Sequence, residues 1–144
     1  MTVSLVREAA VSFVINALLS LAFFLAMFWS KGAQLSFGAP DGLGIDFLPQ
    51  SAAVALMSAL VPALVLRGRW VRMGIGHAPL LRSVVLRALA FAVGGALLGV
   101  LLALLCRGGP VSFLGWQAAL WIKLVYGGLL GAMITTMTLR RMVR

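Results

Sequence analysis

Apolar residues fill four stretches of about 20 residues, and short polar or glycine-rich segments separate these stretches. A helix of about 20 residues is about 30 Å long, which matches the hydrocarbon thickness of a bilayer. The pattern predicts an all-α polytopic membrane protein. Residues 1–144 would form one domain, a bundle of four transmembrane helices. The predicted spans cover residues 9–29, 47–66, 88–106 and 117–137.

The first apolar stretch has a second interpretation, a cleaved signal peptide with Arg7 in its charged region. The stretch is longer than the roughly 7–15 apolar residues of a signal peptide, and no A-x-A-like site follows Trp29. We therefore expect a retained helix. Glycine and proline in residues 30–46 predict a loop, and arginines mark residues 67–87 as a basic connection between the second and third spans.

Polar and small residues recur every three or four positions within the spans, so each set shares one helix face. The sets are Glu8, Ser12, Asn16 and Ser20 in the first span, Ser51, Ala55, Ser58 and Pro62 in the second, Ala88, Ala92, Gly95, Gly99 and Ala103 in the third, and Lys123, Gly127, Gly131 and Thr135 in the fourth. Pro62 has no backbone N–H to donate to the carbonyl of Ser58 one turn earlier, so that carbonyl is predicted to be released.

These faces admit two interpretations. Small residues let helices approach closely and hydroxyls bond across helix interfaces, which predicts helix packing at Gly95, Gly99, Gly127 and Gly131. Alternatively, polar side chains near both ends of the spans would form two vestibules around a narrow waist, as a permeation path requires. The candidate substrate or pore residues are Lys123, Asn16, Ser12, Ser20, Ser58, Tyr126, Thr135 and Asp46.

Lys123 is the one charged residue inside a predicted span. A lysine at the centre of a transmembrane helix costs roughly 2.5–3.5 kcal/mol on insertion scales, so its position calls for a reason. Its side chain is long enough to reach the outer interface. It is also placed to pair with Asp46 at the start of the second span, or to bind a substrate or anion. The sequence leaves these three alternatives open.

Charge is distributed unevenly around the spans. The chain has 12 basic and 3 acidic residues, with a formal net charge of +9. Four spans place both termini and the basic connection on one face, and the positive-inside rule makes that face cytoplasmic. We therefore expect an integral protein of a bacterial inner membrane that attracts anionic headgroups. Because the basic residues flank apolar spans, we expect no binding of nucleic acid.

The basic connection itself is a candidate binding segment. Arg67, Arg69, Trp70 and Arg72 combine cations with an interfacial aromatic ring, as lipid-headgroup sites do. The same arginines would equally serve as the topology signal and nothing more.

Little in the chain indicates catalysis. Cys106 and His77 are the single cysteine and histidine, so we expect no metal or cofactor. Glu8 lies at the edge of the first span, which leaves no buried carboxylate within the spans for proton-coupled export. No nucleophile and base stand at a suggestive spacing. We expect that the protein is not an enzyme.

Three functions follow as hypotheses. The first is a homo-oligomeric channel or transporter for a small neutral or anionic solute, because the polar face of the first span is matched by Lys123 and its neighbours in the fourth. The second is a non-catalytic accessory or assembly subunit of a larger membrane complex, because the small-residue faces would suit partner helices. The third is a lipid-binding membrane protein.

Overall fold

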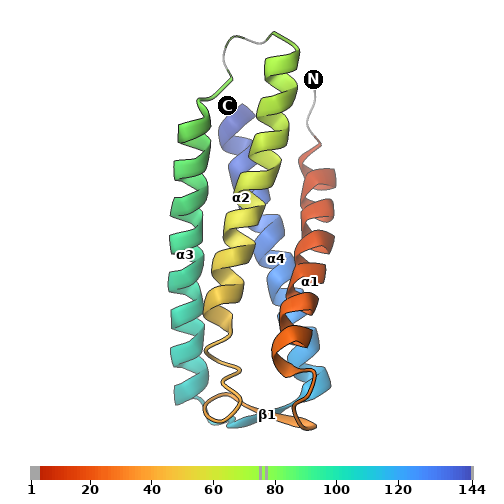
Figure 1. Cartoon of the computed structure of the whole chain (residues 1–144), viewed down its shortest axis with the longest axis vertical. Helices are drawn as coiled ribbons and strands as arrows, with labels where there is room; N and C mark the ends of the chain where they lie inside the picture. The colour runs from red at the N-terminus through yellow and green to blue at the C-terminus, as the bar shows by residue number, and fades with distance from the viewer. Residues whose placement is uncertain (1–3, 75, 77, 144) are drawn as a thin grey trace.

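A computed structural model describes residues 4–74, 76 and 78–143 of the chain; His77 and Arg144 lie outside the described residues. Within these residues the fold is all-α in class, with four long helices and two very short strands (Figure 1). Each of these helices is long and apolar enough to cross a membrane. The elements are α1 (Leu5–Phe28), β1 (Gln34–Ser36), α2 (Phe47–Arg72), α3 (Leu81–Gly108), β2 (Phe113–Gly115) and α4 (Trp116–Val143).

The helices run further than the predicted apolar spans. Helix α2 ends at Arg72 and α3 begins at Leu81, so both enter the segment that the sequence analysis assigned to a basic connection. Arginine is a good helix former, and hydropathy reports only the apolar part of a helix. The end of α2 is marked instead by Gly74, whose φ of 69° is typical of the glycine that follows a helix.

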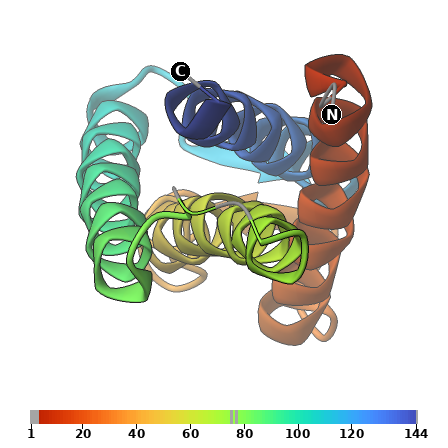
Figure 2. The same cartoon turned by 90° about the horizontal axis from the view of Figure 1, so that it is seen from above.

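The helices pack in a defined order. Helix α2 packs against both α3 and α4, and α4 packs against α1, while α1 and α2 touch only slightly (Figure 2). Both chain termini and the α2–α3 connection lie at one end of the bundle, here called the terminal end (Figure 1). The strands lie at the opposite end, here called the strand end.

The strand end is closed by a small cap that the sequence did not predict. Strands β1 and β2 pair antiparallel, with Leu35 opposite Leu114. Three residues per strand are too few to show an alternating pattern. In the loop that follows β1, Asp41 Oδ2 accepts a hydrogen bond from the backbone N–H of Ser36 at 2.9 Å, which holds the pKa of that carboxyl below its ordinary value. Leu35 and Leu43 are completely buried under this cap.

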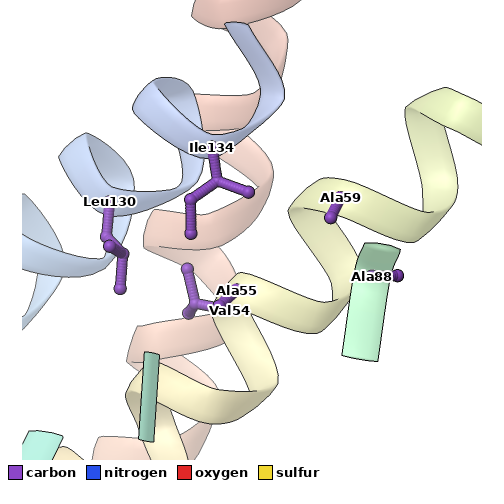
Figure 3. Close-up of a cluster of buried hydrophobic side chains, with 6 residues drawn as sticks. All are labelled: Val54, Ala55, Ala59, Ala88, Leu130 and Ile134. Carbon is purple, nitrogen blue, oxygen red and sulfur yellow. The ribbon is translucent and has the colours of Figure 1, made fainter. Parts of the chain in front are cut away.

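One buried apolar cluster joins α2 to α3 and α4 through small and branched side chains. Leu130 and Ile134 of α4 point toward Val54 and Ala55 of α2, as Figure 3 shows. Ala59 of α2 and Ala88 of α3 complete this cluster. Alanines at these positions let the helix backbones approach closely, which extra methyl groups would prevent.

The glycines on the predicted faces pack inside the chain. A Cβ added at Gly95 would lie 2.5 Å from the backbone oxygen of Ser51, and one added at Gly99 would lie 2.6 Å from that of Phe47. In α4, a Cβ at Gly127 or Gly131 would collide with side-chain atoms of α1. Both small-residue faces are therefore occupied by neighbouring helices of the same chain, which removes the argument that they are free for a partner.

Candidate functional site

Lys123 lies in a closed polar cluster near the strand end. Its Nζ donates to Asp46 Oδ2 and, at 3.0 Å, to Gln50 Oε1. Lys123 is 1% exposed and Asp46 is 5% exposed, so the ion pair is shielded from the surroundings. Of the three alternatives for Lys123, the structure contains the ion pair with Asp46. This burial also means that neither charge faces a lipid headgroup in the described structure.

Gln50 holds the cluster together although the sequence analysis did not select it. Its Nε2 donates to Ser20 Oγ at 2.8 Å and to the backbone oxygen of Lys123 at 3.3 Å. The carboxamide therefore turns its oxygen to the ammonium and its nitrogen to two acceptors. Because Asp46 and Gln50 are one helical turn apart, their spacing is a signal that could have identified Gln50.

Aromatic rings complete this cluster. The Nζ of Lys123 lies 4.4 Å from the centroid of the Phe47 ring, within the range of a cation–π interaction. Tyr126 packs edge-to-face on Phe47, and its hydroxyl lies 2.6 Å from Ser51 Oγ. Since Ser51 Oγ donates to the oxygen of Phe47, the Tyr126 hydroxyl must be the donor to Ser51. Each of the candidate pore residues Ser20, Asp46, Lys123 and Tyr126 thus has a hydrogen-bond partner on another helix or at its start.

A second polar cluster joins α1, α2 and α4 nearer the terminal end. Thr135 Oγ1 donates to the oxygen of Ser58 at 3.0 Å, which is the carbonyl that Pro62 releases. Its own partner, Ser12 Oγ at 2.7 Å, must therefore be a donor. Asn16 Nδ2 donates to the oxygen and the Oγ of Ser12, at 2.8 and 3.1 Å. The chain of hydrogen bonds thus has one direction, from Asn16 through Ser12 and Thr135 to Ser58.

This second cluster forms the floor of a groove between α1 and α2. The groove has a volume of about 510 Å³ and occupies the half of the bundle toward the terminal end. Helix α1 packs closely on α4 and touches α2 only slightly, which leaves room for this groove. The residues that line it are Glu8, Val11, Ser12, Ile15, Asn16, Leu18, Leu19, Met57, Ser58, Val61, Pro62, Val65, Leu66, Arg69, Thr135 and Leu139.

The groove combines apolar walls with charges at one end. Val11, Ile15, Val61 and Val65 on the walls are each between 44% and 57% exposed. Glu8 and Arg69 lie at the terminal end of opposite walls, and no ion pair between them occurs among the described residues. Hydropathy could not show this groove, because the same apolar residues would cover any lipid-facing helix.

Two polar atoms of the floor have no hydrogen-bond partner among the described residues. They are Asn16 Oδ1 and Ser58 Oγ, each less than 1 Å² exposed. The orientation of Asn16 is set by Ser12, whose backbone oxygen accepts only from the amide nitrogen. The floor of the groove therefore has two polar atoms without a hydrogen bond to the residues that the structure describes, and these atoms lie beneath the apolar walls.

The candidate headgroup residues fall into different places. Arg67 Nε donates to the oxygen of Pro79 at 2.9 Å and so ties the end of α2 to the segment before α3. Arg72 Nε donates to the oxygen of Gly68 within its own helix. Trp70 is partly exposed, and Arg69 is the one of the four that lines the groove. These four residues are close in the sequence, but they have different surroundings in the structure.

These features define the class of the molecule: a four-helix bundle whose helices are each suited to crossing a membrane, with a closed ionic cluster and an open lateral groove. Within the described part of the chain, no three side chains of His, Cys, Asp or Glu come together as a metal site would require. Comparisons of the chain with protein-family models, with curated proteins and with solved structures found no match.

Proposed function

We propose that this is an integral membrane protein with both termini in the cytoplasm that binds the acyl chain of a membrane lipid between α1 and α2. The groove carries this proposal. Its apolar walls would face hydrocarbon, and its volume of about 510 Å³ is that of a small-ligand site, about 300–1,000 Å³. A lateral opening lets a lipid enter from the bilayer without crossing water.

The length of the groove supports an acyl chain as the occupant. From Glu8 to Leu19 on α1, and from Met57 to Arg69 on α2, each wall extends about 17–18 Å at 1.5 Å per residue. One leaflet of a hydrocarbon core is about 15 Å thick, half of about 30 Å. The groove therefore matches a lipid chain of one leaflet, whereas a partner's transmembrane helix would need a surface across both.

The orientation rests on the arginines. Those at the terminal end include Arg7, Arg67, Arg82 and Arg140, whereas both acids of the loop after α1 lie at the strand end. This asymmetry supports a cytoplasmic terminal end.

Thiol labelling tests the orientation. In a Cys106→Ala background, Gly32→Cys and Gly76→Cys place single thiols at opposite ends of the bundle, where no atom lies within 4 Å of the new Cβ. In intact bacterial cells, a membrane-impermeant maleimide should label the thiol at position 32 and should label the one at 76 only after permeabilisation. The opposite labelling pattern would overturn the orientation.

Filling the groove should remove the bound lipid. We expect the double variant Ile15→Trp with Val61→Trp, one on each wall, to lower the lipid retained after mild detergent extraction by about tenfold, because the indole rings would occupy the groove and the acyl chain could no longer bury its apolar surface there. Val93→Trp is the matched control, since Val93 is 61% exposed on α3 and does not line the groove. Native mass spectrometry gives the lipid per protein. Equal retention by all three proteins would refute the lipid site.

The same spectra address the other hypotheses. A second polypeptide at fixed ratio would support an accessory subunit. A homo-oligomer would justify flux assays in proteoliposomes, and flux lowered by Lys123→Ala or Asn16→Ala would support transport of a small solute. Both functions stay predictions, and the polar faces that motivated transport have a structural explanation in the hydrogen bonds between α1, α2 and α4.

A further inference from the structure

We propose that the lipid in the groove is a zwitterionic phospholipid with a primary-amine headgroup, whose phosphate contacts Arg69 and whose ammonium contacts Glu8. This inference rests on the proposed function, and it specifies the chemistry of the ligand. The observation that carries it is the placement of one cation and one anion on opposite walls at the same end of the groove.

The two charges are complementary to a zwitterion. Arg69 is exposed, and its guanidinium can bind a phosphate with two parallel hydrogen bonds. Glu8 is half-buried, and the ion pairs of the described residues do not include it. A carboxylate at the lipid interface repels an anionic headgroup and attracts an ammonium. A lipid that satisfies both walls must therefore carry both charges.

Hydrogen bonding distinguishes a primary amine from a quaternary one. A primary ammonium has three N–H donors, whereas a choline group has none. A carboxylate gains most from a cation that also donates hydrogen bonds. The groove should therefore prefer an ethanolamine headgroup over choline, although both are zwitterionic.

Glu8 makes this preference differ from that of the surrounding surface. The terminal end is rich in arginine, and each basic residue near a membrane surface attracts anionic lipid by about 1 kcal/mol. Binding governed by net charge would thus favour phosphatidylglycerol. Binding governed by the Glu8 and Arg69 pair would favour phosphatidylethanolamine, so the two explanations predict opposite orders.

A lipid competition separates them. The purified full chain is offered an equimolar mixture of phosphatidylethanolamine, phosphatidylcholine and phosphatidylglycerol with identical acyl chains, and native mass spectrometry identifies the first lipid bound. We expect ethanolamine over glycerol by about tenfold in the original chain, and Glu8→Gln to abolish or reverse this ratio. Arg69→Gln should weaken all three lipids, because they share the phosphate.

Two control variants carry the same charge change as Arg69→Gln but lie beside the groove. Arg7→Gln adjoins Glu8 and Arg72→Gln lies near the end of α2, yet neither residue lines the groove, so both should keep the ethanolamine preference. Preference for the glycerol lipid by the original chain, or a ratio unchanged in Glu8→Gln, would overturn the headgroup assignment. If retention still falls in the Ile15→Trp with Val61→Trp variant, the acyl-chain site stands without it; if retention does not fall, both proposals fail.

Discussion

Replacing Lys123 with methionine should lower the free energy of unfolding by about 3–5 kcal/mol, the usual effect of breaking a buried ion pair. The Asp46 carboxylate, 5% exposed, would lose its charged partner, and Gln50 Oε1 would lose its donor. Unfolding in a titration with denaturing detergent, monitored by circular dichroism, measures this decrease in the free energy of unfolding.

A double variant should restore most of that stability. Lys123→Met combined with Asp46→Asn removes both charges, so no uncompensated charge stays buried, and that charge is the main cost of breaking a buried pair. The thermodynamic cycle of the two single variants and the double variant should therefore show strong coupling. Lys31→Met is the matched control, because Lys31 pairs with Asp41 at 3.6 Å with 38% of its side chain exposed, and should change stability by about 0–1 kcal/mol.

The same set of variants distinguishes a structural role of the ion pair from a role in solute binding. If Lys123→Met proves no more destabilising than Lys31→Met, the buried pair does not contribute as the geometry indicates. If the double variant is stable and solute flux is lost, the Lys123–Asp46 pair acts on the solute in addition to any role in stability. A stable double variant with unchanged lipid retention would place the ionic cluster outside the lipid site, consistent with its position at the strand end.

The sequence predicted the helices well because hydropathy and helix length are local properties. It placed Lys123 and Asp46 as a possible pair, although 77 positions separate them, because alternating spans bring the start of α2 and the start of α4 to the same end. It also predicted that Pro62 frees the Ser58 carbonyl. It could not predict that Thr135 takes that carbonyl, because the partner depends on which helices are neighbours.

The groove could not be predicted from the sequence. Its existence depends on α1 packing against α4 in preference to α2, and four apolar helices of similar length permit several such orders. Glu8 and Arg69 were each noticed as interfacial charges, but their shared position at one groove end follows only from that order. The sequence likewise predicted helix packing at Gly95, Gly99, Gly127 and Gly131, but it could not show whether the packing partner belonged to the same chain.

Adding one methyl group at Gly95 or Gly99 should destabilise the α2–α3 contact by about 1–3 kcal/mol, the usual cost of overpacking. At Gly95 the new Cβ would meet the oxygen of Ser51 at 2.5 Å and the Cβ of Ala55 at 2.6 Å. At Gly99 it would meet the Cα of Leu48 at 2.6 Å. These are mainly backbone atoms, so a helix must move rather than a side chain.

Gly94→Ala provides the matched control for both variants. No atom lies within 4 Å of a Cβ at Gly94, and alanine favours a helix over glycine by about 1 kcal/mol, so this variant should be as stable as the original chain or more so. Thermal unfolding and native mass should be measured together. If Gly95→Ala and Gly99→Ala left stability intact but dissociated an oligomer, the face of α3 would serve a partner chain; because α2 already covers that face, we expect lower stability with the oligomeric state unchanged.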